Sequence, residues 1–287
     1  MNIIKINKEY SNGVELHGYY YGKSPEIAYF DKRPAVVVFP GGGYCFCSDR
    51  EAEPIAAYFL GAGFNVFVFT YSLHEKAAFP RPLIEASVAI RDIREHAEEW
   101  NTDKDKIAVS GFSAGGHLAA LLGTLWNMPE IAEKSGCPNG ENKPNALILG
   151  YPVINTRSWM SDHVDRLTAG RDRAETVKLL DTENNVGKHT PPTFLFHTYA
   201  DNVVSVEDTL CFANALAAND VPFEMHVFTA GYHGLATADG RTGMFDPSAS
   251  KWMQLASDWL WRLFGRSDVA QFCLDFQRKH PNEGDKI

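Results

Sequence analysis

The 287-residue chain is predicted to adopt an α/β fold with a central, mostly parallel eight-stranded sheet and helices on both faces. Continuous apolar runs such as residues 35–39 and 146–150 lack strict alternation, which is typical of strands buried on both faces of a sheet. Between these runs lie segments such as 82–100, in which apolar residues recur three or four positions apart, as on one face of a helix. Strand and helix patterns alternate along the chain, and this order favours a parallel sheet covered on both sides.

The expected elements follow one another along most of the chain. Two short β-like segments open it, and six buried runs follow. The strands are expected at residues 2–7, 15–21, 35–39, 65–71, 106–110, 146–150, 193–199 and 223–229. The helices are expected at residues 50–60, 82–100, 113–126, 206–218 and 250–264.

No linker divides the chain, so residues 1–287 are predicted to form a single domain. Connections in α/β folds usually have about 2–6 residues. The segment 154–192 is much longer, and we interpret it as an insertion or a partial lid. Residues 265–280 are predicted to be a C-terminal helical extension, which either packs on the core or forms a contact in a homodimer.

Composition excludes several classes of protein. A net charge of −9 without a basic cluster argues against a nucleic-acid partner. The longest apolar runs fall far short of the roughly 20 residues of a membrane span, so no membrane partner is expected. The first residues lack the pattern of a signal peptide, and five cysteines, an odd number, argue against a disulfide scaffold. We therefore expect a cytoplasmic location.

The strongest local signal is the motif Gly-x-Ser-x-Gly at residues 111–115. It lies between a predicted strand and a predicted helix, which is the context of a nucleophile elbow. A sharp turn of this kind exposes the serine oxygen, and the flanking glycines avoid side-chain clashes. Ser113 is therefore the candidate nucleophile; the alternative is a tight turn packed by small residues.

A serine hydroxyl is a weak nucleophile and needs a general base. Asp201 follows the predicted strand 193–199, and His233 follows the predicted strand 223–229. Open α/β sheets gather their functional groups at the carboxyl ends of the strands, so both residues are expected beside Ser113. The alternatives are a turn residue for Asp201 and a surface-loop histidine for His233.

The other histidines are weaker candidates for the base. His117 lies in the helix after the elbow and is expected to pack beneath the serine. His197 and His226 fall within strands and are expected to be hydrogen-bonded core residues. His163 lies in the insertion and is expected to line the substrate pocket.

No metal site and no cofactor are predicted. Cys45 and Cys47 are two residues apart, with no second pair at the spacing of a zinc site. The sequence lacks a His-Glu-x-x-His segment and a phosphate-binding loop, and no dinucleotide-binding pattern follows the first strand.

A tetrahedral intermediate needs hydrogen-bond donors for its oxyanion. Three consecutive glycines, residues 41–43, follow the predicted strand 35–39, at the position where lipases and esterases carry a glycine-rich oxyanion loop. Glycines let the backbone approach a substrate closely. Ala114, directly after the candidate nucleophile, is expected to supply a further N–H group. The alternative for the glycines is a plain flexible turn.

Over residues 1–265 the chain resembles the α/β-hydrolase superfamily, and within it the bacterial esterases related to acetyl xylan esterases and to the hormone-sensitive-lipase group. The resemblance lies in VVVFPGGGY, KIAVSGFSAGGHLAA, TPPTFLFHTYADNVV and VPFEMHVFTAGYHGLATA. It implies the α/β-hydrolase fold. It also implies that Ser113 is the nucleophile, that His233 is the base, and that Asp201 orients the histidine.

The resemblance further implies that Gly42, Gly43 and Ala114 donate to the oxyanion. Two departures from the family pattern are visible. The lipase-type His-Gly-Gly-Gly begins here with Pro40, so a side-chain role of that histidine is lost. Strand-like sequence starts at once in place of N-terminal cap helices, which leaves the site more open and disfavours long-chain lipid substrates.

The sequence thus predicts a serine hydrolase that cleaves short-acyl esters, acetyl to butyryl, through an acyl-enzyme on Ser113. The expected substrate is a small ester such as an acetylated xylan oligosaccharide, contacted by Tyr44, His163 and Tyr232. Two alternatives stay open: an amidase, formamidase or small peptidase with the same triad, and a non-catalytic binding protein with a hydrolase fold.

Overall fold

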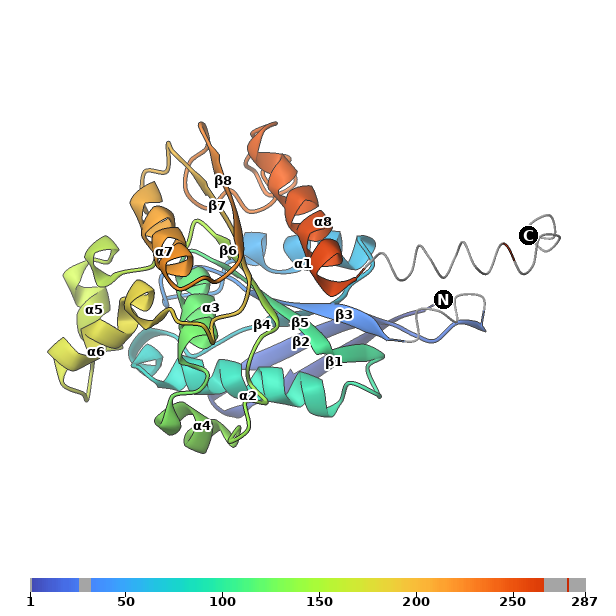
Figure 1. Cartoon of the computed structure of the whole chain (residues 1–287), viewed down its shortest axis with the longest axis horizontal. Helices are drawn as coiled ribbons and strands as arrows, with labels where there is room; N and C mark the ends of the chain where they lie inside the picture. The colour runs from blue at the N-terminus through green and yellow to red at the C-terminus, as the bar shows by residue number, and fades with distance from the viewer. Residues whose placement is uncertain (1, 26–31, 266–277, 279–287) are drawn as a thin grey trace.

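The computed structural model describes residues 2–25, 32–265 and 278. One eight-stranded sheet crosses the molecule in the order β1-β2-β4-β3-β5-β6-β7-β8 (Figure 1). Its strands are β1 (Ile3–Glu9), β2 (Glu15–Tyr21), β3 (Arg33–Phe39), β4 (Asn65–Phe69), β5 (Thr102–Phe112), β6 (Ala146–Gly150), β7 (Thr193–Thr198) and β8 (Phe223–Phe228). The pairs β1–β2 and β2–β4 are antiparallel and all other neighbouring pairs are parallel, which confirms the predicted fold class.

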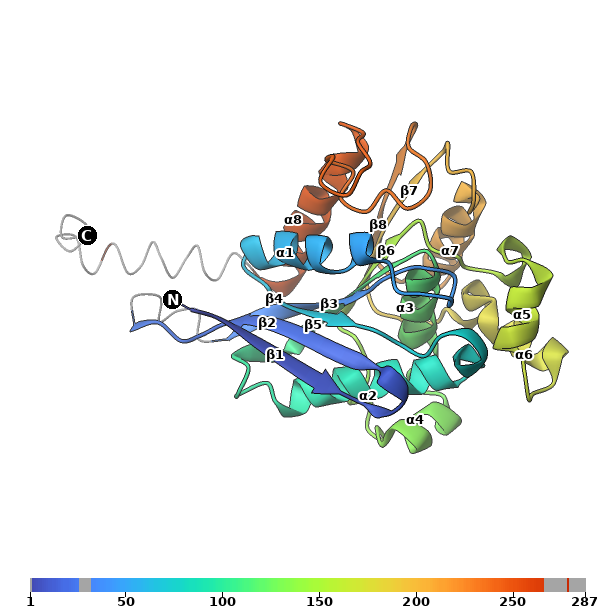
Figure 2. The ribbon, with the colours of Figure 1, turned by 180° about the vertical axis from the view of Figure 1, so that it is seen from behind.

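The central strands are buried on both faces because an apolar layer covers each side of the sheet. All seven residues of β3 are buried; Val37 and Phe39 join one core cluster, whereas Val36 and Val38 join the other. The first cluster includes the helices α2 (Arg81–Glu95), α3 (Ala114–Leu125) and α7 (Val206–Ala218). The second includes α1 (Glu53–Gly61) and α8 (Trp252–Phe264), which lie on the opposite side of the sheet (Figures 1 and 2).

Three short helices lie outside the predicted set: α4 (Pro129–Ser135), α5 (Ser161–Leu167) and α6 (Arg173–Leu180). The last two belong to the long segment 154–192 and lie together at one end of the molecule (Figure 1). The predicted helix 82–100 is shorter than expected, since α2 ends at Glu95.

The predicted C-terminal extension, residues 265–280, lies outside the described residues except for its first residue and Arg278. Within the described ranges, every helix is too short or too polar to cross a membrane.

Candidate active site

Ser113 occupies a sharp turn between β5 and α3. Its φ of 52° and ψ of −119° lie outside the regions that non-glycine residues usually adopt. Glycines make this turn possible: a Cβ atom on Gly111 would lie 2.2 Å from the carbonyl oxygen of Gly115, and one on Gly115 would lie 2.1 Å from that of Phe39. The backbone therefore presents the serine side chain at the carboxyl edge of the sheet, as a nucleophile elbow does.

Substitution of Gly115 by alanine is expected to destabilise the protein. The new methyl group would overlap the Phe39 carbonyl, so β3 or α3 must shift, at a cost of about 1–3 kcal/mol in the free energy of unfolding measured in urea. Gly61→Ala is the matched control, because a Cβ atom there meets nothing within 4 Å and alanine favours a helix. Equal stability of Gly115→Ala and wild type would contradict the tight turn.

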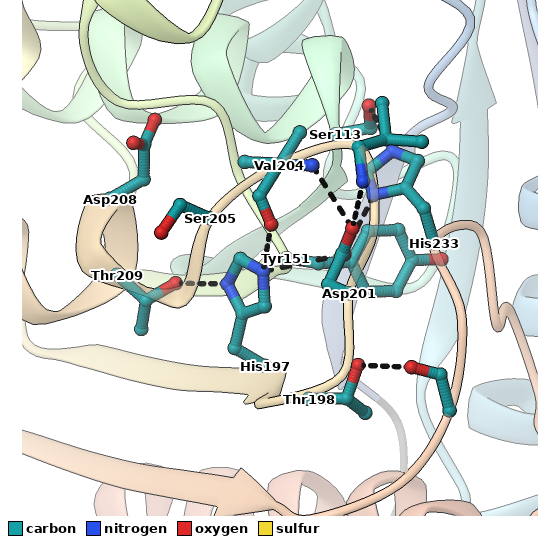
Figure 3. Close-up of polar contacts among 12 residues, drawn as sticks. Ser113, Tyr151, His197, Thr198, Asp201, Val204, Ser205, Asp208, Thr209 and His233 are labelled. Atoms are coloured by element: carbon teal, nitrogen blue, oxygen red, sulfur yellow. Dashed lines mark hydrogen bonds and ion pairs between the residues drawn. The ribbon is translucent and has the colours of Figure 1, made fainter.

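The structure brings together the three side chains that the sequence singles out. The Oγ atom of Ser113 lies 2.9 Å from Nε2 of His233, and Nδ1 of His233 lies 2.8 Å from Oδ2 of Asp201 (Figure 3). Asp201 follows β7 and His233 follows β8, so the ends of three parallel strands supply the cluster. The arrangement joins a hydroxyl, an imidazole and a carboxylate in one hydrogen-bonded row.

Asp201 accepts hydrogen bonds on both carboxylate oxygens. Oδ1 accepts from the backbone N–H groups of Val203 (2.9 Å) and Val204 (3.0 Å), while Oδ2 faces His233. Burial by itself would raise the pKa of Asp201, but hydrogen bonds from His197 and His233, the charge of His233 and the Val203 N–H hold this pKa well below its usual value. The carboxylate is therefore ionised at neutral pH and electrostatically suited to support a protonated imidazole.

His197 is a second histidine on the same carboxylate. Its Nε2 lies 3.3 Å from Oδ2 of Asp201 and 3.1 Å from the carbonyl oxygen of Val204, and its Nδ1 lies 2.7 Å from Oγ1 of Thr209 (Figure 3). A carbonyl oxygen only accepts, so Nε2 carries the hydrogen. The expected hydrogen-bonded core histidine is confirmed, since His197 is fully buried. Its contact with Asp201 was not predicted, although a separation of four residues at one strand end is a signal for it.

The glycine loop after β3 has an unusual backbone. Gly42 and Gly43 have φ angles of 129° and 63°, and a Cβ atom on Gly42 would lie 2.1 Å from the carbonyl oxygen of Phe46. Both glycines line the same cavity as Ser113. Ala114 is the first residue of α3, where N–H groups have no partner within the helix. The three predicted oxyanion donors thus border the serine from the loop and from the helix end.

A cavity of about 470 Å³ opens in front of Ser113 and His233. This size is that of a site for a small molecule. The long segment 154–192 contributes part of its wall with Ser158, Trp159, Met160 and His163. The other lining residues are Gly42, Gly43, Cys45, Phe46, Ser48, Arg50, Glu51, Val153, Val203, Val204 and Gly234.

The three predicted substrate contacts have different positions. His163 lines the cavity. Tyr44 does not line the cavity. Its φ is 57°, and its side chain is buried, with the hydroxyl 3.0 Å from Nδ1 of His117. Tyr232 is 66% exposed and is not among the residues that line the cavity. Tyr44 is therefore a core residue behind the cavity wall in this structure.

Two other histidines, one on a helix and one on a strand, differ in burial. His117 is fully buried beneath the elbow, as expected; burial lowers its pKa to about 4, and its Nε2 lies 2.9 Å from the carbonyl oxygen of Leu180. The expectation of a core position for His226 is wrong. This residue lies on the edge strand β8, its side chain is 28% exposed, and it contacts Glu224 at 3.0 Å.

The described ranges contain no group of three or more His, Cys, Asp or Glu side chains arranged to hold a metal ion. Cys45, Cys47, Cys137 and Cys211 are free thiols.

Comparison with known proteins assigns the chain to a class. With its elbow and its Ser-His-Asp row on an eight-stranded sheet, the chain belongs to the α/β-hydrolase superfamily. Within it, the family model described as BD-FAE matches residues 27–216, and the chain belongs to this family.

Similar proteins include enzymes of known structure. The structure of an α/β hydrolase enzyme from a Medee basin deep-sea metagenome library is 37% identical, with a TM-score of 0.74, over 92% of this chain and 98% of that one. That of an acetyl ester-xyloside bifunctional hydrolase from Caldicellulosiruptor lactoaceticus is 33% identical, with a TM-score of 0.74, over 89% and 90%.

A curated relative is longer than this chain. Endo-1,4-beta-xylanase B of Butyrivibrio fibrisolvens is 39% identical over 217 residues, which are 72% of this chain and 33% of that protein. The chain spans less than half of the length of each of the curated relatives that it matches first.

Proposed function

We propose that this protein is a serine hydrolase of carboxylic esters, with Ser113 as nucleophile, His233 as general base and Asp201 as its partner. One observation carries the proposal: the continuous path from Ser113 through His233 to Asp201, with distances of 2.9 and 2.8 Å, at the wall of a small-molecule cavity. This geometry is that of an activated serine.

In the proposed reaction, Oγ of Ser113 attacks the ester carbonyl carbon while Nε2 of His233 takes the hydroxyl proton. Asp201 holds the other ring nitrogen, Nδ1, as an N–H donor and stabilises the imidazolium that forms. The alcohol leaves with the proton from His233, and the acyl group stays on the serine. A water molecule then attacks the acyl-enzyme with the same base, which releases the acid.

The developing oxyanion needs donors that are in place before the reaction. We assign this role to the N–H groups of Gly42, Gly43 and Ala114. The assignment is supported by the two glycines on the cavity wall next to Ser113 and by the position of Ala114 at the first turn of α3.

We further propose short acyl esters, and acetyl groups on sugars in particular, as the substrates. The volume of about 470 Å³ suits a small ester. A similar solved structure is named as an acetyl ester-xyloside hydrolase, which supports an acetylated carbohydrate. We place the enzyme in the cytoplasm, and the four free thiols of the described ranges support a reducing compartment.

Hydrolysis of p-nitrophenyl acetate, butyrate and octanoate tests this proposal. We expect rapid turnover of the acetate and butyrate and at least about tenfold lower kcat/KM for the octanoate, because the cavity is small. The anilide p-nitroacetanilide is the matched amide, for which we expect no turnover. Faster octanoate hydrolysis would contradict the short-acyl assignment, and turnover of the anilide alone would indicate an amidase.

A further inference from the structure

Glu51 is a buried carboxylate on the cavity wall that the mechanism above does not use. Glu51 lines the cavity but is only 3% exposed. Oε2 accepts a hydrogen bond from the Gly41 N–H at 2.8 Å, and Oε1 accepts one from the Tyr151 hydroxyl at 2.7 Å. Burial raises the pKa of Glu51, against the lowering effect of these two hydrogen bonds and of the charges of His233 and Arg50. A buried carboxylate at this position needs an explanation.

The donors around Glu51 fix the direction of its hydrogen bonds. The Ala236 N–H donates to the Tyr151 hydroxyl oxygen at 3.0 Å. Since a backbone amide donates only, the hydroxyl proton of Tyr151 is left to point at Glu51. The Gly41 N–H also can only donate. Each oxygen of the Glu51 carboxyl group therefore accepts one of these hydrogen bonds.

These hydrogen bonds tie together three loops that surround the site. Gly41 directly precedes the glycines assigned to the oxyanion, and Ala236 lies three residues after His233. Tyr151 follows β6, and its ring meets the ring of His233 edge-on, with 5.1 Å between the centroids (Figure 3). One carboxylate thus connects the oxyanion loop to the loop that carries the base.

The backbone at two of these positions is strained. Tyr151 has a φ of 36° and Ala236 a φ of 49°, in a region that non-glycine residues rarely adopt. Such conformations persist where surrounding contacts hold them, and they cluster at functional sites. The hydroxyl of Tyr151 bonds to Glu51 on one side and to Ala236 on the other, so the network supplies these contacts.

We propose that Glu51 is a positioning residue, which fixes the oxyanion loop relative to His233 by holding Gly41 and Tyr151. This inference rests on the proposed esterase function. The oxyanion donors and His233 must keep their positions relative to each other during the reaction, because a displacement of about 1 Å costs on the order of 100-fold in rate.

The substitution Glu51→Gln tests the proposal. A glutamine has one acceptor oxygen, so either the Gly41 N–H or the Tyr151 hydroxyl loses its acceptor. We expect kcat to fall about 100-fold, with KM changed less than about threefold, because the loss concerns placement in the transition state. Tyr151→Phe keeps the ring on His233 and removes the hydroxyl, so a fall of about tenfold is expected, and the double variant should resemble Glu51→Gln alone.

Glu85→Gln is the matched control. The carboxylate of Glu85 is half-buried and also accepts from a backbone N–H and a hydroxyl, both of Ser72, at 2.9 and 2.6 Å. It is not among the residues that line the cavity, so its kcat should stay within about twofold of wild type. Thermal unfolding of each variant separates loss of placement from loss of fold.

Labelling of Ser113 by a fluorophosphonate gives a readout that needs no turnover. Slow labelling of folded Glu51→Gln supports the proposal. Wild-type kcat and labelling in Glu51→Gln, or a kcat loss that merely follows the unfolded fraction, would overturn it. If Glu51→Gln does not fold, a folded Tyr151→Phe with wild-type kcat and labelling would overturn it instead. A wild-type protein that neither hydrolyses esters nor is labelled would overturn the proposed function, and this inference with it.

Discussion

Replacement of Ser113 by alanine is expected to lower kcat for p-nitrophenyl acetate by about 10⁴–10⁶-fold. The methyl group cannot form the acyl-enzyme, and His233 loses the hydroxyl that lies 2.9 Å from its Nε2. Water activated by the same base leaves a small residual rate. Mass spectrometry after treatment with a fluorophosphonate should show one adduct on the wild type and none on the variant.

Ser110→Ala is the control for that experiment. Ser110 lies on the same strand, β5, three residues before the nucleophile; it is fully buried, and its hydroxyl lacks a hydrogen-bond partner within the described structure. Removal of an unpaired buried hydroxyl is neutral or stabilising, so this variant should keep both kcat and the unfolding midpoint. Wild-type turnover by Ser113→Ala would show that another group is the nucleophile.

The central part of the sheet could be predicted because its strands are buried on both faces. In β3 all seven residues are buried, so a continuous apolar run in the sequence corresponds to one strand. The short helices were not predicted, because few of their residues are buried. In α5, only Val164 and Leu167 are buried among seven residues, and two apolar positions are too few to define a helical period.

The three residues of the proposed triad could be predicted because each lies beyond the end of a strand, in the chain order Ser, Asp, His. The groups proposed to hold these residues in place could not be predicted from the sequence. Tyr151 and Glu51 are hydrogen-bonded across 100 residues of sequence, and such a pairing depends on which loops the fold brings together. Tyr44 illustrates the converse error: an aromatic residue beside the glycine loop suggests a pocket wall, but the local backbone directs its side chain to His117.

Asp201→Asn is expected to have the second large effect, a fall in kcat of about 10⁴-fold. The asparagine oxygen can still accept from the Val203 and Val204 N–H groups, which then directs its NH₂ group toward His233. His233 would have to accept on Nδ1 and carry its hydrogen on Nε2, so it could not take the proton of Ser113. In this orientation the NH₂ group also faces the N–H of His197, since Nε2 of His197 carries a hydrogen. Rotation of the amide does not relieve the conflict, because it would bring the NH₂ group against the N–H groups of Val203 and Val204.

The matched control is Asp208→Asn, at a buried carboxylate in α7 that accepts from Ser158 and from the Ile154 N–H. This variant should lose about 1–3 kcal/mol in the free energy of unfolding, but its kcat should not fall 10⁴-fold.

Acid unfolding adds an independent test of Asp201. Since the folded state lowers the pKa of this carboxyl, ionised Asp201 stabilises the fold above its ordinary pKa near 4, and this contribution is lost as pH falls toward the lowered value. The difference in unfolding free energy between wild type and Asp201→Asn should therefore shrink below about pH 4. A constant difference would contradict a lowered pKa, and wild-type kcat in Asp201→Asn would contradict the triad.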